Sequence, residues 1–180
     1  MCYSIVTVCM EIFILEAFMK ETNNLIDFSN EIFSMSNRRK IQTGLPVNIW
    51  IDENGSYRAG GHGKRIKFQL NYGNKSLDQP EASMGLSGDW ENDAAFNNTY
   101  DKTKSEIKTK DIQKVANFVK NNSYALDKVA DQELYLDQFD QIFIKGGELA
   151  SQSEIDNLKR KVDEFVAENN SETNNVLNME

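Results

Sequence analysis

The sequence is short of the residues on which many recognisable reaction centres depend. Its 180 residues include a single histidine, two cysteines and two prolines. One histidine excludes two-histidine metal sites, zinc fingers and the histidine pairs that ribonucleases use for acid–base catalysis. Both cysteines, Cys2 and Cys9, lie near the start of the chain. They therefore provide no disulfide framework, and they favour a reducing compartment, which we take to be the cytoplasm.

Long uninterrupted apolar runs are also missing. The most apolar stretch, residues 1–19, contains Glu11 and Glu16, follows no basic region and precedes no small-residue cleavage pattern. These features argue against a signal peptide and a membrane helix, so we expect no membrane association. Met19 and Met35 are both plausible internal starts. The stretch is then either a buried N-terminal strand or helix, or residues that precede the natural start, and both alternatives stay open for residues 1–18. We interpret residues 1–43 as an N-terminal segment in which a short helix follows this stretch.

Positive charge is scarce relative to negative charge. The chain carries 28 acidic against 20 basic residues, which gives a formal net charge of −8. Such a charge repels a phosphate backbone at long range and attracts basic surfaces of other proteins. A protein partner is therefore favoured over direct binding of nucleic acid.

Glycine is concentrated in GGHGK at residues 60–64, which ends in the Gly-Lys pair found in phosphate-binding loops. The spacing excludes such a loop: the first glycine of that motif would fall on Arg58, and Lys64 is followed by Arg65 instead of serine or threonine. A strand pattern also follows, whereas phosphate loops lead into a helix. No dinucleotide-binding fingerprint is present, and we predict neither a cofactor nor a metal site.

Two stretches with alternating apolar residues predict a β-hairpin near residues 45–72. Val47, Ile49 and Ile51 alternate with polar residues and are followed by the turn signal Asn54-Gly55. Ile66, Phe68 and Leu70 then alternate in the same way. A further short strand is expected around Met84 and Leu86. We predict an α+β fold in which a small antiparallel sheet packs against C-terminal helices, with residues 44–168 forming a single domain.

Helical patterns dominate the second half of the chain. Residues 110–120 carry an apolar stripe that we expect to end at Asn121 and Asn122, and residues 123–139 continue as an acidic helical stretch. Ser151 and Glu154 form a capping-box pattern before another apolar stripe, from Ile155 to Val166. Residues 36–40, SNRRK, are interpreted as a basic loop, and residues 169–180 as a disordered tail.

Two oppositely charged surfaces compete as the binding site. The first is a basic, partly aromatic strip on the hairpin, with two interpretations: recognition of a phosphate or an acidic partner, or an ordinary solvated sheet face. The second is the acidic stretch from Asp127 to Asp140, either a solvated helix face or a mimic of nucleic-acid charge. His62 is a candidate general base, a hydrogen-bonding loop residue or an exposed turn residue. The candidate binding residues are Trp50, Tyr57, Arg58, His62, Lys64, Arg65, Lys67, Asp137 and Asp140.

The runs TGLPVNIWIDENGSYRAGGHGKRIKFQ and DIQKVANFVKNNSYALDKVADQ resemble a pattern in small accessory proteins of phages and mobile elements. The resemblance carries no established activity. It implies a protein that binds and inhibits a larger host protein or protein–RNA complex, such as a CRISPR effector, as anti-CRISPR proteins do. Two alternatives stay open: a small metal-independent nuclease or toxin that uses His62 with Arg65, and a nucleic-acid-binding regulator.

Overall fold

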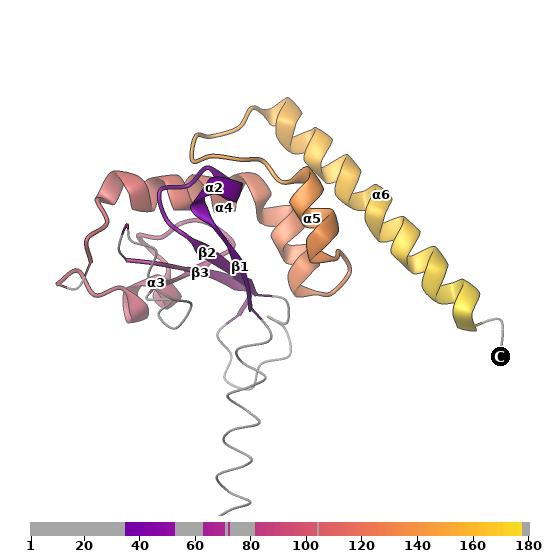
Figure 1. Cartoon of the computed structure of the whole chain (residues 1–180), viewed down its shortest axis with the longest axis horizontal. Helices are drawn as coiled ribbons and strands as arrows, with labels where there is room; N and C mark the ends of the chain where they lie inside the picture. The colour runs from indigo at the N-terminus through magenta and orange to yellow at the C-terminus, as the bar shows by residue number, and fades with distance from the viewer. Residues whose placement is uncertain (1–34, 53–62, 71, 73–81, 104, 178–180) are drawn as a thin grey trace, which may run out of the picture. The chain divides into compact units, whose positions relative to one another are not determined.

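An antiparallel sheet and the helices that follow it make up the described structure (Figure 1). The computed structural model describes residues 35–52, 63–70, 72, 82–103 and 105–177. The described residues belong to one compact unit that begins at Met35. Its elements are β1 (Met35–Arg38), α2 (Lys40–Thr43), β2 (Ile49–Asp52), β3 (Arg65–Phe68), β4 (Ala82–Gly85), α3 (Ala94–Thr99), α4 (Thr109–Ala130), α5 (Leu136–Ile142) and α6 (Gln152–Leu177).

The sheet confirms the predicted α+β fold and its hairpin. The strands follow one another in the order β1-β2-β3-β4, and each neighbouring pair is antiparallel. Ile51 pairs with Ile66, which in turn pairs with Met84. These three side chains are at most 1% exposed, so the alternation in the sequence identified the buried face of the sheet correctly.

Helix α4 lies at the centre of the unit, because it packs against β2 as well as against α5 and α6 (Figure 1). Its buried side chains include Ile112, Val115 and Val119. Leu158 and Val162 of α6 belong to the same apolar core. Because other elements cover α4 on more than one side, it buries polar residues as well as its apolar stripe.

The first strand corrects the predicted loop at residues 36–40. Residues 36–38 lie in β1, where Asn37 pairs with Trp50 and Arg38 pairs with Ile49. Polar side chains at an edge strand give no alternating apolar signal, so the pattern did not reveal the strand. The compact unit consequently begins at Met35, before the predicted domain start at residue 44.

The predicted end of the helix at Asn121 and Asn122 is wrong, since α4 continues to Ala130. The Asn121 side chain donates to the carbonyl of Glu148 at 2.7 Å, and that of Asn122 donates to the carbonyl of Ile144 at 2.9 Å. Asparagine disfavours helix interiors because its amide competes for backbone groups. Here both amides have partners in the α5–α6 loop, and these tertiary contacts offset the weak propensity.

Helix α6 begins as the sequence predicted and ends later. Its capping box is present, because the Glu154 amide donates to Ser151 Oγ at 3.4 Å while the Ser151 amide donates to the Glu154 carboxylate at 2.8 Å. The prediction placed a disordered tail from residue 169, but the helix runs to Leu177. Asn169 donates to the Glu133 carbonyl at 2.9 Å, which ties this part of α6 to the α4–α5 turn. No helix in the described part of the chain combines the length and apolarity needed to cross a membrane.

Candidate functional site

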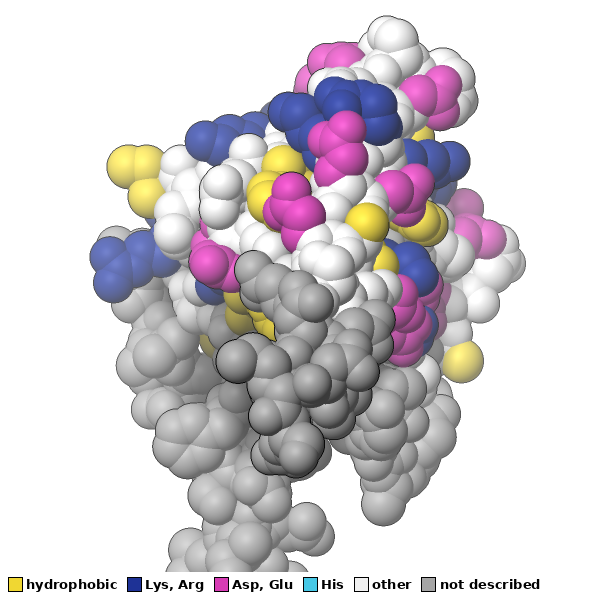
Figure 2. Space-filling view, turned by 90° about the vertical axis from the view of Figure 1, so that its right-hand side faces the viewer, with side chains coloured by type: hydrophobic (Ala, Val, Ile, Leu, Met, Phe, Trp, Pro, Cys, Tyr) yellow, Lys and Arg dark blue, Asp and Glu magenta, His cyan; other side chains and the backbone are white. Residues whose placement is uncertain are grey.

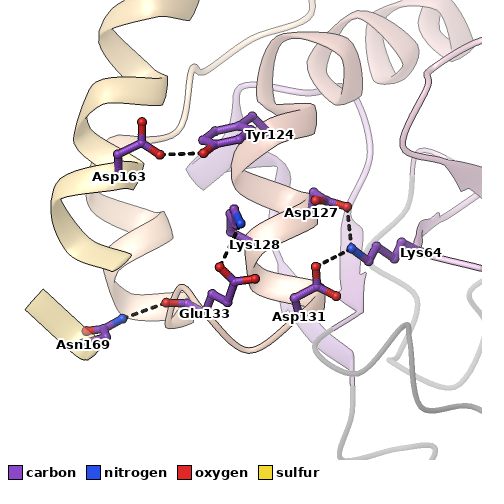
Figure 3. Close-up of polar contacts among 8 residues, drawn as sticks. All are labelled: Lys64, Tyr124, Asp127, Lys128, Asp131, Glu133, Asp163 and Asn169. Atoms are coloured by element: carbon purple, nitrogen blue, oxygen red, sulfur yellow. Dashed lines mark hydrogen bonds and ion pairs between the residues drawn. The ribbon is translucent and has the colours of Figure 1, made fainter. Parts of the chain in front are cut away.

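The basic hairpin and the acidic helix, which the sequence offered as rival surfaces, meet at Lys64. Lys64 directly precedes β3 and lies two residues before Ile66, so it shares the strand face that points toward α4. Asp127 lies in the last turn of α4, and Asp131 directly follows the helix as its C-cap residue. Because they are four residues apart, the two side chains lie on one side of the helix end. The Lys64 ammonium is 2.6 Å from a carboxylate oxygen of each aspartate, as Figure 3 shows.

Both aspartates act on the ionisation of Lys64. Partial burial alone would lower the pKa of the Lys64 ammonium, but hydrogen bonds and charge from Asp127 and Asp131 outweigh it, so the pKa lies above 10.5. Lys64 is consequently a cation at neutral pH, and its two carboxylate partners hold it in place. We call this group, Lys64 with Asp127 and Asp131, the lysine clamp, because it connects the start of β3 to the last turns of α4.

A second ion pair connects the sheet to the acidic segment. Arg38 Nε is 2.6 Å from Asp140 Oδ1, and the two side chains are 11% and 36% exposed. Asp137, also on α5, is exposed, and its carboxylate accepts a hydrogen bond from the Gln138 amide at 2.9 Å. Of the two predicted acidic contact residues, Asp140 is therefore engaged inside the chain, while Asp137 points outward.

Further polar pairs lie on the part of α4 that faces α6 and the α4–α5 turn, away from Lys64 (Figure 3). Lys128 is 2.8 Å from Glu133, and this hydrogen bond raises the pKa of Lys128. The Tyr124 hydroxyl donates to Asp163 of α6 at 2.5 Å, which raises the pKa of that hydroxyl. These pairs fasten α4 to α6 and to the α4–α5 turn, and so their polar groups support the fold.

The predicted basic strip is less exposed than expected. Trp50 and Arg65 are 5% and 8% exposed, and Lys67 is half-buried. The interpretation of Arg65 as part of a solvated sheet face is therefore wrong. Other side chains on the same face of the sheet are buried as well, including Gln69 and Ser83 at 1% and 4% exposure. Three candidates, Tyr57, Arg58 and His62, lie outside the described residues.

The loop between α5 and α6 is held by polar contacts from α4 that sequence reasoning missed. Asn117 donates to the Gly147 carbonyl at 2.9 Å, and the carbonyl oxygen of the Asn121 side chain accepts from the Ala150 amide at 3.0 Å. With the bonds from Asn121 and Asn122 already described, three amides of α4 hold one short loop. The only signal in the sequence was the Gly146-Gly147 pair, which indicates a turn but not its partners.

The outward side of α6 carries both signs of charge. A shallow hollow there is lined by Asp156, Lys159, Arg160, Asp163, Glu164 and Ala167. Figure 2 shows basic and acidic side chains interspersed on the visible face of the molecule. Arg160 pairs with Glu164 within the helix, so this surface resembles an ordinary solvated helix face. Among the residues with described positions, no three His, Cys, Asp or Glu side chains are grouped to hold a metal ion.

Comparisons of the chain with protein-family models, with curated proteins and with solved structures find no match.

Proposed function

We propose that the chain is a non-enzymatic binding protein of a phage or mobile element, which attaches to a larger host protein or ribonucleoprotein, such as a CRISPR effector, and inhibits it. The observation that carries this proposal is the lysine clamp, with Asp127 and Asp131 each 2.6 Å from Lys64. The basic hairpin and the acidic helix, which the sequence offered as rival binding surfaces, are joined to each other there. Recognition by the outer surface is then the function that the described residues support best.

The charge of the whole chain supports a protein partner. With a net charge of −8, the chain is attracted to basic surfaces such as the nucleic-acid grooves of nucleases. The resemblance to accessory proteins of mobile elements supports the same class of partner. Inhibition then requires only that the bound chain blocks a groove or holds the partner in an inactive state.

The test is capture followed by inhibition. Full-length tagged chain is used to capture partners from a bacterial host, and the partner identified in this way is purified and assayed with increasing amounts of the chain. We expect a stoichiometric complex and a loss of partner activity that saturates at that stoichiometry. If the purified chain instead cleaves nucleic acid by itself and His62→Ala abolishes the cleavage, the protein is an enzyme and the proposal is wrong.

Single charge reversals then test the contact surfaces expected from the sequence. Asp137→Lys changes the exposed acid of α5, and Lys67→Glu changes the half-buried cation of β3. Arg65 and Asp140 are unsuitable for this purpose, because the former is buried and the latter pairs with Arg38. The matched control is Asp156→Lys on α6, where the side chain is exposed. A contact residue weakens capture when its charge is reversed, and the control leaves capture unchanged.

A further inference from the structure

The described part of the chain exposes two large aliphatic side chains on adjoining segments. Ile41 of α2 is 86% exposed, and Leu149 of the α5–α6 loop is 68% exposed. The two segments touch, because the Gly146 amide donates to the Thr43 carbonyl at 2.7 Å. A single exposed aliphatic residue is ordinary, but two on joined segments form a candidate contact surface.

The segments that carry these side chains are held in place. Gly44 ends α2 with a φ of +73°, and a Cβ atom built there would lie 3.3 Å from the Gly146 nitrogen. Gly147 packs against α4 so closely that an added Cβ atom would lie 2.3 Å from the Cβ atom of Lys114. Together with the asparagine contacts from α4, this packing presents Leu149 on an ordered loop. A preformed loop loses little conformational entropy on binding, which favours affinity.

Several cations lie on the segments that carry the two aliphatic residues or on the part of α4 that contacts the loop, although the chain as a whole is acidic. Arg39 precedes Ile41 by two residues, Lys145 precedes Gly146, and Lys110 lies one helical turn before Lys114 on the α4 side that contacts the loop. The acids nearby are Glu148 in the loop, Glu106 before α4 and Asp111, whose carboxylate lies 3.9 Å from the Lys114 ammonium. We define the α2 patch by its two aliphatic residues and these cations: Arg39, Ile41, Lys110, Lys114, Lys145 and Leu149.

We propose that the α2 patch docks an acidic protein segment that carries apolar side chains, so that its carboxylates meet the cations and its apolar side chains cover Ile41 and Leu149. Charge complementarity selects an acidic partner, and exposed aliphatic area selects a partner with apolar side chains. Single-stranded nucleic acid fits less well, because its bases stack on aromatic side chains and the patch has none.

This inference rests on the proposed binding function and adds the surface and the chemistry of the partner. It also separates two charge systems of the chain. The lysine clamp and the Arg38–Asp140 pair join opposite charges within the unit, as Lys114 and Asp111 do at the edge of the patch. Arg39, Lys110 and Lys145 of the patch are exposed cations, and an acidic segment of the partner would meet these three charges.

A direct test uses a defined probe and full-length chain. The probe is a fluorescent peptide in which Glu and Asp alternate with Leu and Phe, and its control peptide has serine in place of each Leu and Phe. Binding is measured by fluorescence anisotropy, with single-stranded DNA and RNA of equal charge as competitors. We expect the probe to bind, the serine peptide to bind at least about tenfold more weakly, and the oligonucleotides to compete poorly.

Two double variants locate the binding. Ile41→Ser with Leu149→Ser removes the aliphatic area, and Lys110→Gln with Lys145→Gln removes charge. Each is expected to weaken probe binding by about tenfold, with a smaller salt dependence for the lysine variant. The matched controls, Tyr135→Ser and Lys102→Gln, alter exposed residues outside the patch and should bind the probe like the wild type.

The proposal is overturned if the probe does not bind, if both double variants bind it as the wild type does, or if the oligonucleotides displace it readily. Failure of the patch is distinguishable from failure of the binding function. If the Ile41→Ser, Leu149→Ser double variant captures and inhibits a natural partner as well as the wild type does, the binding function stands and the patch is rejected as its contact surface. Absence of any partner that the wild type inhibits rejects the function, while the peptide measurement still reports on the patch.

Discussion

Replacement of Asn122 by alanine should destabilise the protein severely, because this residue connects α4 to the α5–α6 loop from a fully buried position. Asn122 is 0% exposed. Its Nδ2 donates to the carbonyls of Phe118 and Ile144, both at 2.9 Å, and its Oδ1 accepts from the Ile144 amide at 2.7 Å. Asn122→Ala removes all three bonds and leaves the Ile144 peptide groups without these partners.

The expected loss follows from the number of groups involved. Leaving a fully buried peptide group without its partner costs about 1–3 kcal/mol, and the two groups of Ile144 are part-buried, so that each is expected to cost about 1–2 kcal/mol. The higher helix propensity of alanine returns about 0.5 kcal/mol. We therefore expect the free energy of unfolding to fall by about 1.5–3.5 kcal/mol, measured by urea denaturation followed by far-UV circular dichroism.

A matched substitution separates the hydrogen bonds from helix propensity. Asn170 is an exposed asparagine of α6, so Asn170→Ala changes propensity without removing a buried contact. Its unfolding free energy should stay the same or rise slightly. If Asn122→Ala unfolds at the same urea concentration as Asn170→Ala, the reasoning that Asn122 fastens the loop is refuted.

Two further predictions concern the lysine clamp and a crowded glycine. Lys64→Met should lower the unfolding free energy by about 1 kcal/mol at neutral pH; the loss is small because the partners of Lys64 are partly exposed to water. A double-mutant cycle with Asp131→Asn should give a coupling free energy that becomes smaller as the salt concentration rises. Because the pKa of Lys64 is raised above 10.5, the ion pairs of Lys64 stabilise the fold fully below pH 10.5, and this stabilisation is lost as the pH rises through the folded-state pKa. If Lys64→Met is still less stable than the wild type at higher pH, the ion pairs are not the source of the difference. Gly88→Ala should lower the thermal unfolding midpoint more than Gly63→Ala does. Both glycines have a positive φ, so both substitutions strain the backbone. Only at Gly88 would the new Cβ atom also meet a backbone oxygen, that of Ala116 at 2.6 Å. Equal effects of the two alanine substitutions would show that backbone conformation alone decides the cost.

The hairpin and the start of α6 were predictable because their signals are local. Alternation of Ile49 and Ile51 on one strand and of Ile66 and Phe68 on the next marks the buried face without reference to any other element. Ser151 and Glu154 satisfy each other within a single turn. Such patterns require only neighbours in the sequence, and the structure confirms them.

The remaining features depend on partners that are distant in the sequence. Asn122 is compatible with the middle of a helix only because Ile144 supplies backbone partners. Arg65 reads as an exposed strand residue by alternation, but burial of that face in the folded unit leaves it only 8% exposed. Local patterning contains no information about which face a distant segment covers.

The candidate site shows the same division between local and distant information. Composition identified a basic hairpin and an acidic helix, but not that Lys64 of one lies 2.6 Å from Asp127 of the other. Charge patterning reports where charges lie along the chain, whereas pairing depends on the tertiary fold. The α2 patch escaped notice for the same reason, since the segments that carry Ile41 and Leu149 meet through Thr43 and Gly146, which are far apart in the sequence.

The central claim, that the chain acts by binding a partner through the α2 patch, is tested most directly by hydrogen–deuterium exchange of the full-length chain with and without the captured partner. Slower exchange is predicted at residues 39–45, 108–114 and 145–150 in the complex, with α5 and α6 unchanged. Protection confined to α5 and α6, or to the hairpin at residues 63–70, would contradict the account.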